Sequence, residues 1–478
     1  MTDTSWVIGI DLGTGGCRAC AVDARGAVLA CCDAPYPTST PLPGWAEQNP
    51  GDWYDAAVTA LRALLSSPNV PSTKVAAIGL TSAAHIGVLL DDAMQPVRPA
   101  ILWQDQRTVA EVAELELAAG EEILRQTYQA VSTGWTLPHL CWVRKNEPDA
   151  WGRVAHIELS KDYLLRRMTG ARTTDPGTAL SSQLYDATTG TWSDPLCGLA
   201  GTSTAALPAI QPNDSIGGHV TAQFAVATGL PEGIPVIVGG LDSATELIAA
   251  GATRPGDAVI RLASAGGVQV VVAGPEPNRR LITYPHATGT GWYRQAGTST
   301  CATAVKWARD IFAPGMSFAE WDELAATSPA GANGVFFEPH LAGERAPYWD
   351  PTLRGRISGL SLSVSAADIA RAVYEGTAYS IRDALTLLDS EISPATTLSV
   401  VGGGAKSRLW TSVLAAVLNR PVRPLPEAHS AAGAAMLALG AVGDGAPAWN
   451  SAPSIVEPDS DFVELYERGF HAYVNAHK

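Results

Sequence analysis

Short apolar runs alternate with glycine-rich turns at the start of the chain. Residues 6–10 (WVIGI) form an apolar, β-branched run that leads into the turn at 11–16 (DLGTGG). Two further runs, 17–23 and 27–32, follow and are separated by residues 24–26 (ARG). Apolar β-branched runs bounded by such turns are typical of strands and hairpins. The pattern therefore predicts three successive strands, with the glycine turn between the first two.

Helical and strand-like patterns alternate after these strands. Residues 52–65 and 109–119 place apolar side chains at helical spacing, whereas 75–80 form an apolar run of strand length. Regular alternation of the two patterns predicts an α/β fold. A dinucleotide-binding fold places its glycine turn between a strand and a helix, whereas the turn at 11–16 lies between two strands. This difference weighs against a dehydrogenase.

The second half of the chain repeats the opening pattern. An apolar run enters glycines and an aspartate at 236–242 (VIVGGLD), and another enters glycines at 398–404 (LSVVGGG). Between them, residues 257–262 form a strand-like run that ends in the small-residue turn 263–267 (ASAGG). Glycine turns after strands in both halves amount to a weak internal symmetry. This symmetry predicts two α/β domains that face each other across a cleft.

Length, composition and charge agree with a large globular protein. The 478 residues are 46% hydrophobic and 17% charged, and a chain of this length has room for about two to four domains. We place the boundary near residue 243, between an N-terminal domain, 1–243, and a C-terminal domain, 244–478. The net charge of −15 leaves no basic footprint for nucleic acid. A phosphate site in such an acidic chain has to be built from backbone N–H groups and a bound cation.

The apolar runs are too short for a membrane protein. None reaches the roughly 20 residues that a membrane-spanning helix needs, and the best candidate, 236–250, contains Asp242 and Glu246. Residues 1–4 lack the basic start and apolar core of a signal peptide. These features predict a cytoplasmic protein without membrane contact, whose partners are small molecules.

The seven cysteines predict no metal or disulfide framework. An odd number does not suggest the paired cysteines of a secreted protein, and a chain of this length needs no disulfides to fold. Cys17 and Cys20 are an odd number of positions apart, so on one strand they point to opposite faces. No histidine follows at zinc-finger spacing. We therefore expect no zinc site among Cys17, Cys20, Cys31 and Cys32.

The turn at 11–16 has the residues of a phosphate-binding loop. Its glycines allow backbone N–H groups to approach phosphate oxygens, because no Cβ atom blocks the path. Thr14 adds a hydroxyl donor, and the Asp11 carboxylate is suited to the water shell of Mg²⁺. A tight hairpin between two strands explains the same residues equally well.

Asp242 and the glycines after residue 401 are further candidates. Asp242 ends a strand-like run and could take the proton of an attacking hydroxyl group, although a helix N-cap explains it as well. Residues 402–407 (GGGAKS) could support a nucleoside or could be a helix-entry turn. Neither the Walker A motif nor the protein-kinase motifs occur in the chain.

Five segments of the chain form a recognisable set. They are 8–14 (IGIDLGT), 98–107 (RPAILWQDQR), 159–164 (LSKDYL) with 167–170 (RMTG), 341–347 (LAGERAP) with 355–360 (GRISGL), and 402–410 (GGGAKSRLW). In sequence and in order they resemble motifs of the FGGY carbohydrate kinases, most closely those of the xylulokinase branch. The resemblance extends from about residue 6 to about residue 439. The chemistry of the segment at 159–170 is left open by the motif.

This resemblance implies a fold of two actin-like (ribonuclease H-like) domains that close on ATP and a sugar. It implies that Asp242 is the catalytic base and that Asp11 binds Mg²⁺ through water. The residues implied for ATP are Asp11, Gly13, Thr14, Gly15, Arg18, Ser264, Gly403, Gly404 and Ser407. Those implied for the sugar are Ala84, His85, Trp103, Asp105, Asp242 and Ser243. The resemblance is also compatible with a homodimer.

The sugar-binding residues differ in part from the branch that the chain resembles. Its Gln-Met-His-Gly stretch is AAHI here, at 83–86, and its second phosphate loop is ASA, at 263–265. Serine follows Asp242 where asparagine is usual. D-xylulose, converted to D-xylulose 5-phosphate, is the first expectation; another pentulose, a tetrulose or a polyol is the alternative. A degenerate, sugar-sensing protein and an actin-like ATPase are further alternatives.

Overall fold

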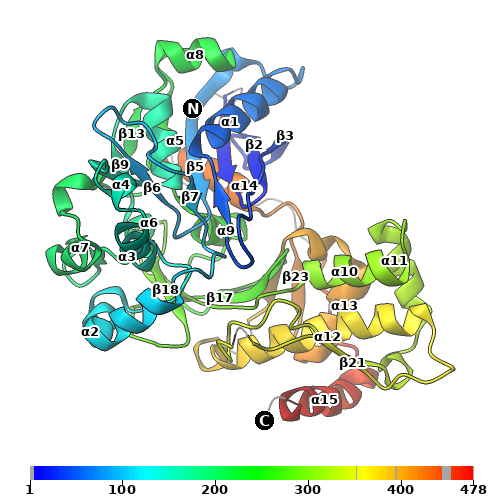
Figure 1. Ribbon diagram of the computed structural model, residues 1–478. Helices are drawn as coiled ribbons and strands as arrows, with labels where there is room; N and C mark the ends of the chain where they lie inside the picture. The colour runs from blue at the N-terminus through cyan, green and yellow to red at the C-terminus, as the bar shows by residue number, and fades with distance from the viewer. Residues whose placement is uncertain (1–4, 351, 393–395, 444–453, 477–478) are drawn as a thin grey trace.

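The computed structural model describes residues 5–350, 352–392, 396–443 and 454–476. Two β-sheets, both covered by helices, form the framework of the molecule (Figure 1). The predicted α/β class is thereby confirmed. Residues 1–4, which entered the signal-peptide argument, lie outside the described residues. No helix of the described chain is long and apolar enough to cross a bilayer.

The first sheet contains the strands predicted at the start of the chain. Its order is β13-β14-β5-β1-β2-β3, with β15 also paired to β5. β1 runs antiparallel to β2 and parallel to β5, and β2 runs antiparallel to β3. The strands are β1 (Trp6–Leu12), β2 (Gly16–Asp23), β3 (Val28–Pro35), β5 (Val75–Ser82), β13 (Ile216–His219), β14 (Pro235–Ile237) and β15 (Gly240–Leu241). The strand–turn–strand prediction is confirmed.

The second sheet repeats the pairing pattern of the first. Its order is β18-β19-β17-β16-β22-β23. β17 is antiparallel to β19 and β16, whereas β16 is parallel to β22 and β22 is parallel to β23. The run β3-β2-β1-β5-β14 has the same succession of pairings, which confirms the predicted internal symmetry. The strands are β16 (Ala258–Leu262), β17 (Gly266–Val272), β18 (Ile282–Pro285), β19 (Trp292–Gly297), β22 (Leu398–Val401) and β23 (Val422–Pro424).

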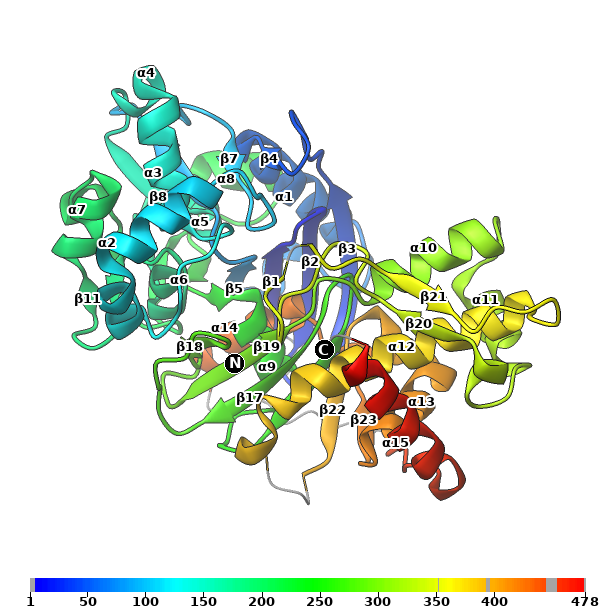
Figure 2. The ribbon, with the colours of Figure 1, turned by 60° about the horizontal axis from the view of Figure 1, so that its bottom comes forward.

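Helix α14 (Ser430–Val442) comes late in the chain but packs on the first sheet, against β1, β5 and α9 (Asp242–Ala249) (Figures 1 and 2). A Cβ atom at Gly9 would lie 1.7 Å from the Ala431 carbonyl oxygen. One at Gly79 would lie 1.9 Å from the Ala434 carbonyl oxygen. Glycine alone allows the helix backbone to approach the strands so closely.

The remaining helices surround the sheets. They are α1 (Pro50–Leu65), α2 (Val109–Thr127), α3 (Thr136–Asn146), α4 (Pro148–Trp151), α5 (Ser160–Thr169), α6 (Pro176–Ser181), α7 (Asp194–Ala200), α8 (Ala222–Thr228), α10 (Ala302–Phe312), α11 (Phe318–Ala326), α12 (Ala366–Thr386), α13 (Arg408–Leu418) and α15 (Ser460–Asn475). Short 3-10 helices are η1 (Ser72–Lys74), η2 (Thr204–Ala206), η3 (Ala332–Gly334), η4 (Asp389–Glu391) and η5 (Gly403–Lys406).

Short strands pair outside the two large sheets. They are β4 (Glu47–Gln48), β6 (Gly87–Leu90), β7 (Ala100–Ile101), β8 (His156–Leu159), β9 (Thr173–Thr174), β10 (Tyr185–Asp186), β11 (Thr191–Trp192), β12 (Ala209–Ile210), β20 (Phe336–Glu338) and β21 (Arg356–Ser358). They form the pairs β4–β7, β6–β8, β9–β12, β10–β11 and β20–β21. Most of them come between β5 and β14 along the chain, in the part that contains the segment 98–107.

Two elements differ from the predicted bounds. The helix predicted at 109–119 continues to Thr127 through Ala119, whose φ of −153° and ψ of 15° are not helical, because apolar burial resumes at Ile123. The strand predicted at 236–242 divides into β14 and β15 at Gly239. Gly239 has a φ of +80°, and a Cβ atom there would lie 2.0 Å from a carbonyl oxygen of β5. The predicted domain boundary near residue 243 falls inside α9 and stays a prediction.

Candidate active site

Three carboxylates and one arginine meet between the two sheets. Asp11 lies near the end of β1, Asp242 and Glu246 lie on α9, and Arg261 lies near the end of β16. Arg261 Nη1 is 3.6 Å from Asp242 Oδ2, and its Nε is 3.6 Å from Glu246 Oε2. The single positive charge of Arg261 therefore cannot neutralise three ionised carboxylates.

The ionisation of this cluster reflects that imbalance. Burial, and after it the charge of Asp242, raises the pKa of Asp11 to about 7. Burial also raises the pKa of Glu246 to about 7, although Arg261 acts in the opposite direction. Asp11 Oδ1 and Glu246 Oε2 are buried and have no hydrogen-bond partner within the described chain. A cation with oxygen ligands would meet unused acceptors at Asp11, so these residues fit Mg²⁺.

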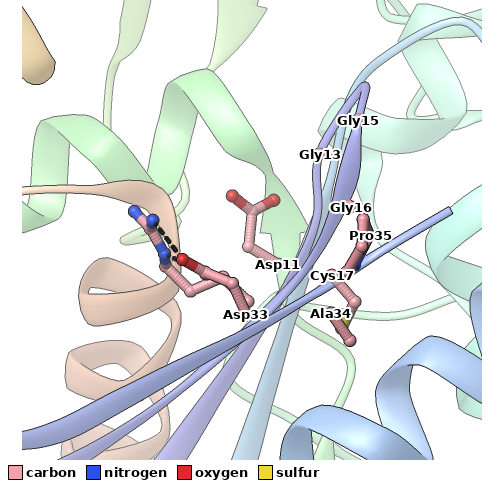
Figure 3. Close-up of a pocket in the computed structure, with 9 residues that line it drawn as sticks. Asp11, Gly13, Gly15, Gly16, Cys17, Asp33, Ala34 and Pro35 are labelled. Atoms are coloured by element: carbon pink, nitrogen blue, oxygen red, sulfur yellow. Dashed lines mark hydrogen bonds and ion pairs between the residues drawn. The ribbon is translucent and has the colours of Figure 1, made fainter.

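The glycine turn after β1 is a hairpin that also lines a cavity of about 350 Å³ (Figure 3). Gly13 N donates to the Gly16 carbonyl oxygen over 3.0 Å, which closes the hairpin. The turn is held from outside by the Gln48 side-chain amide, which donates to the Thr14 carbonyl oxygen over 2.8 Å. Figure 3 shows the Asp11 carboxylate and the glycines around one space. The hairpin is confirmed and the same turn lines a cavity, while its role in binding phosphate stays a prediction.

Arg18 and Asp33 form the outer part of this cavity. Arg18 Nε donates to Asp33 Oδ1 over 2.7 Å, and its Nη2 donates to Oδ2 over 2.9 Å. The bond to Arg18 lowers the pKa of Asp33. Arg18 stands directly opposite Asp11 in the β1–β2 register, so the sheet holds this cation beside the carboxylate cluster.

The small-residue turn after β16 occupies the equivalent place in the second sheet. Residues 263–265 join β16 to β17, as 13–15 join β1 to β2. The Ser264 carbonyl oxygen accepts hydrogen bonds from Cys301 N (3.0 Å) and Thr303 Oγ1 (2.8 Å), and Ser264 itself is exposed. The pseudo-symmetry of the sheets therefore brings Ser264 to a position like that of Thr14.

The glycines after β22 are packed unequally. A Cβ atom at Gly402 would lie 2.7 Å from the Leu262 carbonyl oxygen, and one at Gly404 would lie 2.6 Å from the Trp410 ring. At Gly403 no atom lies within 4 Å of that position. The Ser407 hydroxyl accepts from Trp410 N over 3.0 Å and caps α13. Gly403 thus offers open backbone, whereas the others serve the turn and the helix entry.

His85 lies where the two sheets meet and is a neutral hydrogen-bond acceptor. Its Nδ1 is 2.8 Å from the Ser181 carbonyl oxygen, which can only accept, so Nδ1 carries the proton. Its Nε2 therefore accepts from the Tyr284 hydroxyl at 3.1 Å. Burial holds the pKa of His85 well below its usual value. Because Tyr284 lies on β18, the second sheet completes the surroundings of a residue from the first half.

Trp103 links the segment 98–107 to the turn at 11–16. Its Nε1 donates to Thr14 Oγ1 over 3.3 Å, and the Arg345 guanidinium lies 5.5 Å from the centre of its ring. Arg345 Nη2 donates to the Thr298 carbonyl oxygen over 2.6 Å, while its buried Nε has no partner among the residues that the structure describes. Arg345 was not among the predicted site residues, although it lies in the family motif at 341–347.

Ala84, Ser243 and Asp105 differ in what they can offer a ligand. Ala84 packs beside the apolar core between the sheets, and the Ser243 hydroxyl is 2.7 Å from that of Tyr293. Asp105 is fully buried: Ala46 N (2.6 Å) and Arg107 Nη2 (2.7 Å) donate to its Oδ2, and Arg107 Nε (2.9 Å) donates to its Oδ1. Both oxygens of Asp105 are thus used within the segment that presents Trp103.

The segment at 159–170, whose chemistry the motif left open, supports the backbone before Asp242. Lys161 is fully buried, and its Nζ donates to Asp162 Oδ1 (2.8 Å) and to the Val238 carbonyl oxygen (2.8 Å). Asp175 Oδ2 lies 3.3 Å from the same ammonium group. Asn213 Nδ2 donates to the next carbonyl oxygen, that of Gly239, over 2.9 Å. Two consecutive carbonyl groups are therefore fixed just before β15 and the start of α9.

Both halves of the chain match models of one protein family. Residues 6–249 match the model for the N-terminal domain of the FGGY family of carbohydrate kinases, and residues 264–442 match the model for its C-terminal domain. A xylulose kinase of Staphylococcus epidermidis (strain ATCC 12228) is 31% identical, over 99% of this chain and 96% of that protein. A xylulose kinase of Bacillus subtilis is 32% identical, over 91% of this chain and 87% of that protein.

Solved structures show the same fold. The crystal structure of xylulose kinase from Rhodospirillum rubrum is 32% identical, has a TM-score of 0.85 and covers 99% of this chain and 98% of its own. The crystal structure of Plasmodium falciparum glycerol kinase with ADP has a TM-score of 0.83 at 20% identity. The match covers 99% of this chain and 98% of the glycerol kinase chain. The predicted two-domain, actin-like architecture is confirmed.

Proposed function

Because the chain belongs to the FGGY family of carbohydrate kinases, we propose that it transfers the γ-phosphate of ATP to D-xylulose and forms D-xylulose 5-phosphate. The observation that carries the choice of sugar is the set of xylulose kinases that are about one-third identical over nearly the whole chain. The predictions of the family, of a sugar kinase and of ATP as co-substrate are confirmed.

Asp242 is the proposed catalytic base. It starts α9, its Oδ1 accepts from Ser243 N over 2.7 Å, and its Oδ2 lies 3.6 Å from Arg261 Nη1. A carboxylate in this position accepts the proton of the sugar hydroxyl as its oxygen bonds to phosphorus. Lys161 and Asn213 support this role, since they hold the backbone that leads to Asp242.

Asp11 is the proposed magnesium ligand, through water. The unpartnered Oδ1 beside two further carboxylates supports this assignment. When bound, Mg²⁺ neutralises the charge that develops on the phosphate oxygens. Binding of the cation requires the ionised carboxylate, so Asp11 gives up its proton as the complex forms.

The proposed ATP site extends from one sheet to the other. We assign the phosphates to backbone N–H groups of Gly13 and Gly15, the hydroxyls of Thr14 and Ser264, and the Arg18 cation. The nucleoside is assigned to the turn of Gly403, Gly404 and Ser407, where the open backbone at Gly403 supports the assignment. In this arrangement the domains 1–243 and 244–478 each supply one phosphate turn and close together on the nucleotide.

The proposed sugar site lies between His85, Trp103 and Asp242. His85 Nε2 is an acceptor for a sugar hydroxyl in place of Tyr284, and the Trp103 ring packs against sugar C–H groups. Ala84 and Ser243 complete the lining, while Asp105 acts by holding the segment that carries Trp103. We further propose a cytoplasmic homodimer, and size-exclusion chromatography and cell fractionation test those two points.

A coupled ADP-release assay over pentuloses, tetruloses, polyols and hexuloses tests the function. We expect kcat/KM for D-xylulose to exceed that for the other sugars by about tenfold or more. A higher value for another sugar would reassign the substrate within the family. ADP release that ignores every sugar would indicate an ATPase, and sugar binding without turnover would indicate a sensing protein.

A further inference from the structure

Cys20 and Cys31 form a disulfide bond between β2 and β3. The two residues are direct partners in the antiparallel register, so their side chains leave the same face of the sheet side by side. The expectation of no disulfide is therefore wrong at this pair, because pairing depends on the β2–β3 register and not on the cysteine count. Cys20 is buried, whereas Cys31 is exposed and open to a reagent.

His429 lies against both sulfur atoms. Its Nε2 is 3.8 Å from Cys20 Sγ and 3.7 Å from Cys31 Sγ. Its Nδ1 accepts a hydrogen bond from Ala432 N over 3.2 Å and so caps α14. A backbone N–H can only donate, so the lone pair is on Nδ1 and the proton of the neutral ring is on Nε2. That proton points toward the sulfur atoms.

The ring is neutral at ordinary pH, because burial, and after it the charge of Arg18, lowers the pKa of His429 to about 4. A neutral N–H donor beside sulfur stabilises a thiolate more than a thiol. The helix cap thus fixes His429 in the tautomer that assists a departing or attacking sulfur.

The cysteine pair adjoins the phosphate cavity without being part of it. Along both strands it is two residues from the Arg18–Asp33 ion pair, which lines that cavity. The charge of Arg18 lowers the pKa of His429, so the two sites are close enough to influence each other. One β-hairpin, β2–β3, therefore carries both the disulfide bond and the ion pair that lines the cavity.

We propose that Cys20 and Cys31 are a redox-active pair that a dithiol reduces reversibly, and that the state of the pair changes the affinity for ATP. A thiolate of the dithiol attacks exposed Cys31 Sγ, the Cys20–Cys31 bond breaks, and Cys20 leaves as a thiolate that accepts from His429 Nε2–H. The second thiol of the reagent then attacks the reagent sulfur of the mixed disulfide and releases Cys31. The two protons lost by the dithiol pass through solvent to the cysteines, which leaves an oxidised reagent and two thiols. The step requires two electrons, both from the dithiol.

The same three residues could be considered a metal site, since Cys20, Cys31 and His429 place their ligand atoms within 4.8 Å of one another. A metal at Nε2 needs the lone pair there, which moves the proton to Nδ1 and breaks the cap on α14. Thiol–disulfide chemistry keeps the cap intact and is therefore the reaction that the geometry favours.

Counting thiols in the native protein tests the chemical part. Dithiothreitol treatment of the native protein, then an acid quench and alkylation after unfolding, should raise the number of labelled cysteines found by mass spectrometry by two, at Cys20 and Cys31. His429→Ser keeps a good helix cap but has no side-chain N–H donor and is too short to reach the sulfur atoms, so reduction should slow by about tenfold. A pair that resists reduction in the folded enzyme, or zinc retained in equal molar amount by the reduced protein, overturns the proposal.

The effect on ATP rests on the proposed kinase function and is measured separately. We expect the KM for ATP to differ by about threefold between the oxidised and the reduced protein, with kcat unchanged. The effect is small because the Arg18–Asp33 ion pair is half exposed. Cys31→Ala, and the double variant with Cys20→Ala, should show one KM under both conditions. Equal KM values in the wild type, or an equal shift in these variants, refute the coupling. An enzyme without kinase activity fails this assay alone and leaves the thiol count to decide the first part.

Discussion

Asp11→Asn is expected to make the ligand-free protein more stable above pH 7 while it removes phosphoryl transfer. The Asp11 carboxyl group ionises near pH 3.8 in an unfolded chain, but burial and the Asp242 charge raise its pKa to about 7 in the fold. Between these values the native state holds a proton that the unfolded state has lost. Stability therefore falls as pH rises through this window. Asparagine has no charge to bury, so the variant escapes that loss.

The size of the effect follows from the shift. At about 1.4 kcal/mol per pKa unit, the full shift corresponds to about 4 kcal/mol at pH 8. Asp11 is only partly buried as a residue, and water at its exposed edge reduces the difference, so we expect about 2–4 kcal/mol. Most of the range between pH 3.8 and pH 7 lies above pH 5. At pH 5 the variant's gain in free energy of unfolding should therefore be about 2 kcal/mol smaller than at pH 8.

Urea unfolding of the ligand-free proteins, followed by circular dichroism at pH 5 and pH 8, measures the difference. Asp33→Asn is the matched control on the same cavity: Arg18 lowers the pKa of Asp33, so its removal should destabilise the protein slightly at pH 8. An Asp11→Asn variant with the same stability difference at both pH values would refute the reasoning. So would a variant less stable than the wild type at pH 8.

Three further predictions concern the base, its support and the helix contact. Asp242→Asn should lower kcat by about a thousandfold, while ATP binding, measured by calorimetry, persists; near-normal turnover would remove Asp242 as base. Lys161→Met leaves two buried carboxylates without a cation and should lower the free energy of unfolding by about 3–5 kcal/mol; Lys145→Met, which removes an exposed cation, is the control and should change it by less than about 1 kcal/mol. Gly9→Ala should destabilise by more than about 4 kcal/mol, because its Cβ meets the α14 backbone. Gly198→Ala, which meets no atom within 4 Å, should be close to neutral in the same urea titration.

The first three strands of the chain were predictable because they depend on local sequence patterns. The runs at 6–10, 17–23 and 27–32 are strands, and the turn at 11–16 is the hairpin between them. Burial of one face and short turns specify such elements through neighbouring residues alone. The same is true of Asp11 and Asp242, which could be chosen because each ends an apolar run two residues from a glycine.

Partners far along the chain could not be predicted in this way. Tyr284 meets His85 across 199 positions, and His429 meets Cys31 across 398. Arg261 is one basic residue on an apolar strand, and nothing in its neighbourhood marks it as the counter-ion of Asp242 and Glu246.

The sequence by itself determined the strands and turns, the family and the carboxylates that serve the proposed reaction. The tertiary structure alone decided which groups surround them, which carboxylates hold protons near pH 7, and which cysteines pair. The physical reason is that secondary structure follows from contacts over a few residues. Charge balance, desolvation and sulfur pairing instead depend on distances in space, and those distances are set when the two sheets and α14 pack together.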